Sequence, residues 1–177
     1  MLGKLTLIAK HLWLDASDTR RAIPAELAHR LAAQVAASEQ RHSGQIRICI
    51  EASLPASYLW RLERGKTLNA LIRERAVMMF GKLRVWDTEH NNGVLIYVLL
   101  AEHAIEIVAD RGLTHPVNAA QWQAMVTRMG VAFKAKRYEE GLALALEEIS
   151  TLLVTHFART EAPSAYPNEL PDTPLLQ

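Results

Sequence analysis

The chain has 177 residues, enough for one domain of ordinary size whose core needs no disulfide or structural metal. Hydrophobic residues make up 50% of it, and 20 lysines and arginines stand against 19 aspartates and glutamates, which gives a formal net charge of +1. This balance argues against a nucleic-acid partner, because such proteins carry a strong positive field. The single cysteine, Cys49, excludes a disulfide within the chain.

The N-terminal segment, residues 1–22, contains one apolar stretch, LTLIAKHLWL. Lys10 and His11 interrupt it, and it is shorter than the roughly 20 apolar residues that cross a bilayer. It also lacks the small-residue cleavage site of a secretory signal. We therefore expect a cytoplasmic protein without a transmembrane segment. Two roles stay open for this stretch: it lies on a membrane surface, which would make the protein membrane-peripheral, or it packs against a partner.

The first helix and the first strand are predicted from two different periodicities. Between residues 24 and 43, leucine and valine recur at four-residue spacing, which is typical of a helix with one buried face. The segment QIRICIEASLP then alternates three isoleucines with Arg47, Cys49 and Glu51 before Pro55 ends the pattern. This alternation predicts a half-buried strand with its polar positions toward solvent.

The middle of the chain predicts a long helix followed by a hairpin. Residues 57–83 have a broad apolar side, with an early break at Gly65. Residues 94–100 are apolar at every position, which indicates a strand covered on both faces. A second strand, residues 104–109, follows after a turn that is too short for anything except a hairpin, so these two strands are antiparallel.

The last third of the chain predicts two helices and a tail. Asn118 with Gln121 three positions later is a helix-start pattern, and a further helix covers residues 138–157. We place one α/β domain at residues 23–158. Residues 159–177 contain four prolines and are expected to form a tail without its own fold, whose removal leaves the melting temperature nearly unchanged.

This order of elements predicts an α/β fold, a three-layer α/β/α sandwich with a small mixed sheet and flanking helices. A right-handed crossover should make the first two strands parallel. The hairpin then returns Asp110 beside Asn92, and the loop that carries Asp87 and Glu89 enters the same edge of the sheet. Glu51, at the exit of the first strand, falls on the opposite edge.

Four residues at this edge, Asp87, Glu89, Asn92 and Asp110, carry the oxygen ligands that calcium prefers, although their spacing matches no EF-hand. The neighbouring Arg111 is a candidate phosphate-binding residue. The alternative is that these are solvated loop residues and that the Asn-Asn-Gly sequence is simply a turn into the strand. The seven histidines show no metal-ligand spacing, which argues against zinc.

Three segments resemble the TPM domain family, in its bacterial branch that lacks a signal peptide and membrane anchor. They are SGQIRICIEASLP, RAVMMFGKLRVWDTEHNNGVLIYVLLAEHAIEIVADRGL and WQAMVTRMGVAFKAKRYEEGLALALEEISTLLVTHF, and the match covers roughly residues 44–157. The strand entry NNG and the exit ADRGL resemble the corresponding family segments at Asn92, Gly93, Asp110 and Gly112. The stretch THPVN has no acid where the membrane-anchored branch usually has one.

The resemblance implies an α/β/α sandwich and two activities described for relatives. A chloroplast branch is described as an acid phosphatase acting in photosystem repair, and some bacterial members bind calcium at acidic residues on one sheet edge. The leading hypothesis is therefore a TPM domain that binds calcium, with Asp87 and Asp110 holding the metal and Arg111 steadying a phosphate if it is a metal-dependent phosphomonoesterase. The alternative hypothesis is a non-enzymatic binding or assembly module for a membrane-associated protein partner.

Overall fold

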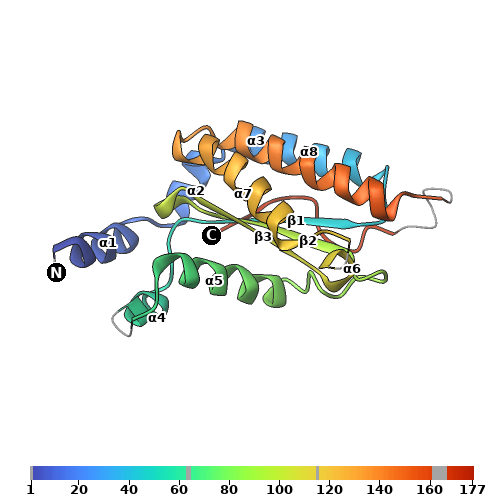
Figure 1. Ribbon diagram of the computed structural model, residues 1–177. Helices are drawn as coiled ribbons and strands as arrows, with labels where there is room; N and C mark the ends of the chain where they lie inside the picture. Colours follow the sequence, from blue (N-terminus) through green and yellow to red (C-terminus); the bar gives the residue numbers. More distant parts are fainter. Residues whose placement is uncertain (1, 63–64, 115, 161–166) are drawn as a thin grey trace.

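The computed structural model of the protein describes residues 2–62, 65–114, 116–160 and 167–177 (Figure 1). Its elements in chain order are α1 (Leu2–Trp13), α2 (Ala16–Ala22), α3 (Ala25–Glu39), β1 (Gln45–Glu51), α4 (Ala56–Leu59), the 3-10 turn η1 (Trp60–Leu62), α5 (Leu68–Lys82), β2 (Gly93–Leu99), the 3-10 turn η2 (Leu100–Glu102), β3 (Ala104–Ala109), α6 (Arg111–Thr114), α7 (Ala119–Lys134), α8 (Tyr138–Phe157) and β4 (Leu175–Leu176).

The four strands form one mixed sheet in the order β3-β2-β1-β4. β1 and β2 are parallel, and β2 and β3 form the antiparallel hairpin that the short turn predicts. In this register Val94 lies opposite Ala109, whereas Glu51 lies opposite Leu99 at the far end of β2. The predicted topology is therefore confirmed, including the placement of Glu51 away from Asp110.

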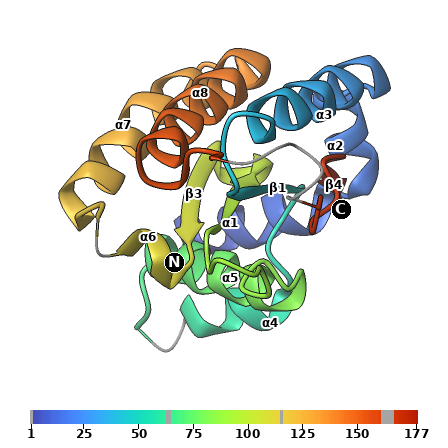
Figure 2. The same ribbon diagram turned by 90° about the vertical axis from the view of Figure 1, so that its right-hand side faces the viewer.

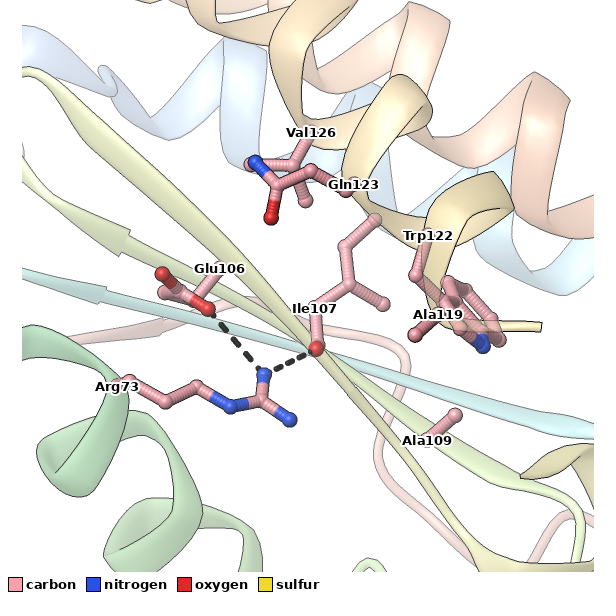
Figure 3. Close-up of a pocket in the computed structure, with 8 residues that line it drawn as sticks. All are labelled: Arg73, Glu106, Ile107, Ala109, Ala119, Trp122, Gln123 and Val126. Atoms are coloured by element: carbon pink, nitrogen blue, oxygen red, sulfur yellow. Dashed lines mark hydrogen bonds and ion pairs between the residues drawn. The ribbon is translucent and has the colours of Figure 1, made fainter. Parts of the chain in front are cut away.

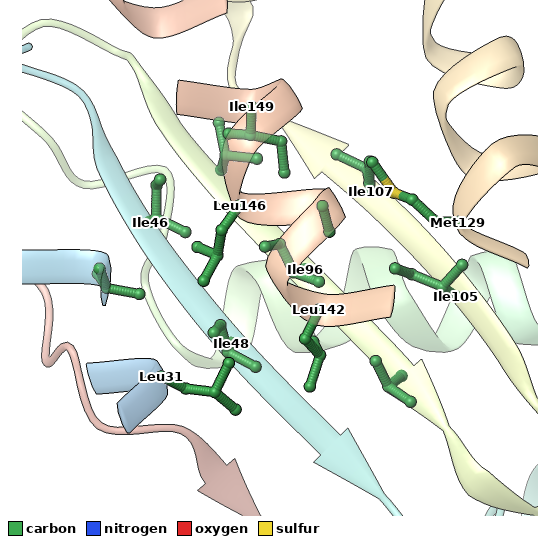
Figure 4. Packing of buried hydrophobic residues seen from close by; sticks show 14 of the residues in the cluster. Leu31, Ile46, Ile48, Ile96, Ile105, Ile107, Met129, Leu142, Leu146 and Ile149 are labelled. Carbon is green, nitrogen blue, oxygen red and sulfur yellow. The ribbon is translucent and has the colours of Figure 1, made fainter. Parts of the chain in front are cut away.

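Helices cover both faces of the sheet, which confirms the α/β/α sandwich (Figures 1 and 2). Isoleucines of β1, β2 and β3 pack against α3, α7 and α8, and Figure 4 shows Leu142, Leu146 and Ile149 of α8 among the isoleucines of β1 and β2. The residues between those isoleucines point to the other face, where they meet α4 and α5. The central strands are buried on both sides because successive side chains of a strand alternate between its faces.

The predicted helix over residues 57–83 is divided. The structure has α4 and η1, then Gly65 with a φ of 87°, and then α5, whose N-cap Thr67 accepts a hydrogen bond from Ala70 N. Only glycine adopts such a φ at little cost, so the break expected at Gly65 is confirmed. Residues 63–64 lie outside the described part of the chain.

The expectation that β1 turns one polar face to solvent is wrong, because all seven of its residues are buried. Glu51 accepts hydrogen bonds from the Tyr97 hydroxyl at 2.6 Å and from Arg75 Nε at 2.7 Å. Arg47 donates to the backbone oxygens of Pro171, at 2.6 Å, and Thr173. Charged side chains are thus tolerated on a buried face since each finds partners there.

The expectation that the tail does not pack is also wrong for residues 167–177. β4 pairs in parallel with β1, and Leu170 is buried in the core on the α5 side of the sheet. The side-chain oxygen of Gln45 accepts hydrogen bonds from the backbone N–H groups of Glu169 and Leu170. Prolines prevent a regular helix here but leave an extended segment free to cover an edge of the sheet. Residues 161–166 lie outside the described part of the chain.

The N-terminal helix α1 is tied to the domain near its C-terminal end. His11 is buried, its Nδ1 accepts a hydrogen bond from Leu54 N at 3.0 Å, and Lys10 forms an ion pair with Glu102. The next two side chains, Leu12 and Trp13, are 68% and 86% exposed. Across the four described ranges of the chain, no helix has the length and apolar character needed to span a membrane.

His42, in the turn between α3 and β1, is fully buried and held in one tautomer. The Gly44 carbonyl can only accept, so His42 Nδ1 donates to it at 3.1 Å, and Nε2 accepts from the Ser38 hydroxyl at 2.8 Å. Burial lowers the pKa of His42 from 6.5 to about 4. The neutral ring is therefore part of the packed junction between helix and sheet.

This depressed pKa predicts that acid weakens the contribution of His42 to the stability of the fold. The stability that neutral His42 contributes is complete above pH 6.5 and is lost as the pH falls from 6.5 through 4, since the unfolded chain takes up the proton first. Burial raises the pKa of Glu39 to about 8, and this acts in the opposite direction, so the His42 contribution is read by comparison with His42→Gln: relative to that variant, the urea midpoint of the original chain should fall over this window. Replacing the exposed His29 by Gln is the control and should leave the pH dependence of the original chain unchanged. A His42 ring that titrates near 6.5 by NMR would contradict the prediction.

Candidate functional site

Backbone hydrogen bonds join the entry of β2 to the exit of β3. Asp110 N donates to Gly93 O, and Gly112 N donates to Asn91 O, both at 2.9 Å. Asn91 has a φ of 52°, a left-handed conformation that asparagine tolerates better than most residues. The structure therefore brings Asn92 and Asp110 to the same edge of the sheet, as the sequence predicts.

Two side-chain oxygens at this edge are buried and have no hydrogen-bond partner among the described residues: Asn92 Oδ1 and Asp110 Oδ2. The other atoms of these side chains are held in place. Asn92 Nδ2 donates to Ser43 Oγ at 3.2 Å, and Asp110 Oδ1 accepts from Arg111 N at 2.7 Å. A buried acceptor without a hydrogen bond lowers the stability of a folded protein. We therefore expect each of these oxygens to contact a water molecule or a cation.

Two glycines allow the backbone to close this tightly. A methyl group on Gly93 would lie 2.0 Å from Val85 O, and one on Gly112 would lie 2.5 Å from Asn91 O. Both obstacles are backbone atoms, which cannot rotate away as a side chain can. Glycine is therefore required at both positions by close approach of the chain.

The other predicted ligands lie near this edge with different partners. Asp87 forms an ion pair with Arg84 at the surface. Glu89 is exposed, and its backbone N–H donates to Glu169 of the tail at 3.0 Å. Within the described ranges, no group of three or more His, Cys, Asp and Glu side chains is placed to hold a metal ion. The role of Asp87 and Glu89 as ligands stays a prediction.

Arg111, the predicted phosphate-binding residue, is exposed directly after Asp110, and its Nε donates to Asn91 Oδ1 at 2.9 Å. This bond orients the guanidinium beside the edge. The nearby helix α7 begins with the predicted capping box, in which Asn118 and Gln121 each accept the other's backbone N–H at 2.9 Å.

Sequence reasoning missed one residue of the site, Ser43, which anchors Asn92 from the turn before β1. No local pattern marks it, because it lies far from Asn92 in the sequence and only the parallel pairing of β1 with β2 brings the two together. Thr88 supports the same residue by accepting from Asn92 N at 3.1 Å. His115, the histidine nearest to the exit of β3 in the sequence, lies outside the described residues.

Comparison with known proteins gives a matching family and related solved structures. The sequence model of the TPM domain matches residues 16–152. Among curated proteins, none matches the chain. The NMR structure of BA42 protein from the psychrophilic bacterium Bizionia argentinensis is similar, with a TM-score of 0.70 and 24% sequence identity over 86% of this chain and 94% of that one. This likeness establishes a shared fold.

Proposed function

The chain belongs to the TPM domain family, and from this premise we propose that it binds a divalent cation, calcium first among them, at the sheet edge formed by Asn92 and Asp110. The observation that supports the proposal is the pair of buried, unpartnered oxygens in the described part of that edge, Asn92 Oδ1 and Asp110 Oδ2. Uncharged and charged oxygens together are the ligand type that calcium takes.

The same observation bounds the affinity. Calcium takes six to eight oxygens, and only two side-chain oxygens at this edge are both buried and without a partner among the described residues, so water would complete the shell. Asp110 is the one full charge of that pair. Because calcium affinity rises with ligand charge, we expect a dissociation constant on the order of millimolar. Magnesium, which gives up its own water reluctantly, should bind more weakly.

Calcium binding should stabilise the folded protein and depend on Asp110. At ten times the dissociation constant, calcium should add about 1.4 kcal/mol of stability, a rise in melting temperature of roughly 3–5 °C. Asp110→Asn should abolish this rise, since it removes the charge and places an NH2 donor in the site. Differential scanning fluorimetry with and without calcium, at matched ionic strength, measures both effects.

Glu140→Gln is the matched control. Glu140 lies in the first turn of α8, away from the sheet edge with Asn92 and Asp110, and its surface carboxylate pairs with Arg137. The variant should keep the full calcium response. Asp87→Asn tests the role of Asp87. A smaller calcium-dependent rise in melting temperature would make Asp87 a ligand, and an unchanged rise would mean that it only forms the ion pair with Arg84. A water molecule at the two oxygens would give no calcium response in any variant, and that result would rule out the cation site.

Metal-dependent phosphomonoesterase activity is a secondary part of the proposal. Asn92 and Asp110 would hold the cation, which when bound would supply positive charge for a phosphoryl oxygen. Arg111, oriented by its bond to Asn91, would hold the phosphate. Hydrolysis of p-nitrophenyl phosphate that requires calcium and is lost in Asp110→Asn would support it, and activity that survives chelation would count against it.

The alternative function, a binding module for a membrane-associated partner, is favoured by α1. Leu12 and Trp13 turn large apolar surfaces to solvent beside the buried His11. Exposed apolar side chains of this size often mark an interaction surface. A protein without any calcium response would favour this second function over the first.

A further inference from the structure

β3 forms one edge of the sheet, and none of the described residues adds a strand on its outer side. Opposite residues in an antiparallel pair alternate between those that exchange hydrogen bonds and those that do not. The bond from Asp110 N to Gly93 O fixes this alternation, so every second residue of β3 bonds to β2. The backbone groups that point outward, away from β2, are those of Ile105, Ile107 and Ala109.

Arg73 of α5 gives independent support for this orientation. Its Nη1 donates to the backbone oxygen of Ile107 at 2.5 Å and to Glu106 Oε2 at 3.2 Å (Figure 3). The Ile107 carbonyl therefore points to the outer side of the strand. A charged side chain near an edge strand also discourages uncontrolled pairing with other chains.

The outer side of β3 lies at the bottom of a groove. Two hollows of about 420 and 430 Å³ adjoin along the strand and share Glu106, Gln123 and Val126. One wall is α5, through residues such as Asn69 and Arg73, and the other wall is α7. Figure 3 shows the strand passing between these walls, with Gln123 and Val126 above it and Arg73 below it.

We propose that this groove binds an extended peptide segment of a partner protein, which adds to β3 as a further strand. The outward N–H and C=O groups of Ile105, Ile107 and Ala109 form a row of alternating partial charges that repeats every two residues, roughly 7 Å apart. The Ile107 carbonyl, which already accepts from Arg73, would accept the peptide N–H with its second lone pair. An extended backbone carries the complementary row, which is the basis of strand addition.

The walls of the groove favour a single strand over a second copy of the chain. Because α5 and α7 both line the groove on the outer side of β3, edge-to-edge pairing of two copies would have to accommodate two pairs of these helices. A lone extended segment has no flanking helices and reaches the strand between the walls. The occupant is therefore a peptide segment and not another sheet.

The two walls also set the chemistry of the segment. The α7 wall is largely apolar, with Trp122, Val126 and Ala119, and the α5 wall carries Arg73 beside Glu106. Side chains of a bound strand would point alternately to these walls. The groove thus selects a segment with alternating apolar and polar residues, its apolar side chains facing Trp122.

Hydrogen exchange tests the open edge in the protein alone. The amides of Ile105, Ile107 and Ala109 should exchange faster than those of Val108 and Glu106, which bond to β2. Protection of the first set that rises with protein concentration would mean that a second copy occupies the edge, and this would overturn the proposal.

The peptides for the binding tests are selected from a library of random linear peptides displayed on phage. The full chain is the bait. Selected peptides should alternate apolar and polar residues and protect the amides of Ile105, Ile107 and Ala109 from exchange. N-methylation of the peptide at alternate positions should weaken binding about tenfold in one register and leave the other register unchanged, because only every second peptide N–H faces β3. Equal effects in both registers would overturn the proposal.

Substitution in the protein gives a second readout. Ala109→Pro removes one outward N–H of an edge strand, a position that tolerates proline, and should weaken peptide binding about tenfold. Ala109→Ser keeps that N–H and should bind as the original chain does. Equal affinity of the two variants, or a selection that yields no peptide protecting β3, would contradict strand addition. The N-methyl series stays decisive if the proline variant does not fold.

Discussion

A chain that ends at residue 166 is expected to melt roughly 10 °C below the full chain, a loss of about 4 kcal/mol or more. The largest contribution comes from Arg47. It is buried in β1, and its guanidinium donates to the backbone oxygens of Pro171 and Thr173, which the truncation removes. A hydrogen bond to a charged group contributes about 1.5–3 kcal/mol, so the loss of both bonds accounts for most of the decrease, and exposure of the surface that Leu170 covers adds to it.

The contribution of Arg47 can be isolated by a second substitution. In an Arg47→Met chain the tail forms no hydrogen bonds with a charged side chain at position 47. The same truncation should therefore lower the melting temperature by less than half as much. Thermal unfolding of the four proteins, full and truncated with Arg47 or Met, forms a double-mutant cycle. A drop of under 2 °C on truncation of the original chain would show that the tail does not pack on β1.

Gly93→Ala is expected to destabilise the protein by about 3 kcal/mol, the upper end of the usual cost of overpacking. Its methyl group would lie 2.0 Å from Val85 O, so the loop between α5 and β2 would have to shift. That loop ends at Asn92, and the variant should therefore also lose its calcium response. Urea unfolding and the calcium-dependent melting shift measure the two effects.

Gly130→Ala is the control for this substitution. It lies within α7, and apart from the adjoining backbone of the helix no described atom lies within 4 Å of where its methyl group would be. Alanine in the interior of a helix is favoured over glycine by up to about 1 kcal/mol. The control should be as stable as the original chain or more so, and a Gly93→Ala chain of unchanged stability would contradict the close approach at Val85.

The fold was predictable because its core follows local periodicity. The isoleucines at 46, 48 and 50 mark a strand, and the short turn between β2 and β3 leaves a hairpin as the only connection. These signals fixed the parallel and antiparallel pairings and placed Asp110 beside Asn92 while Glu51 fell at the other end. The sandwich follows from the order of these elements along the chain.

The tail was not predictable because its anchors leave no side-chain pattern. Pro171 and Thr173 bind Arg47 through backbone oxygens, which every residue possesses. In the sequence, Arg47 alternates with isoleucines and therefore indicates a solvent-facing position. Its burial depends on a segment that lies more than a hundred residues later in the chain. Only the three-dimensional pairing of β4 with β1 reveals this contact.

The position of the candidate site on the sheet was predictable from the sequence, but only some of its residues were. Asn92 and Asp110 meet because hairpin geometry requires it. Asp87 and Glu89 are close to them in sequence, but Asp87 pairs with Arg84 in its own turn and Glu89 is exposed beside the tail. Nearness in sequence places a residue on a loop, whereas its rotamer and partners decide whether its carboxylate points inward. Those depend on the packed structure.

The central claim is most directly tested by a calcium titration followed through the backbone amide signals of the protein by NMR. A cation held by Asn92 Oδ1 and Asp110 Oδ2 should shift the amides of Asn92, Gly93, Asp110 and Arg111, with saturation on the order of millimolar calcium. The signals of β1 near Glu51, at the other end of the sheet, should stay in place. Amides at Asn92 and Asp110 that do not move up to tens of millimolar calcium, or saturable shifts confined to another part of the chain, would contradict a cation site at this edge.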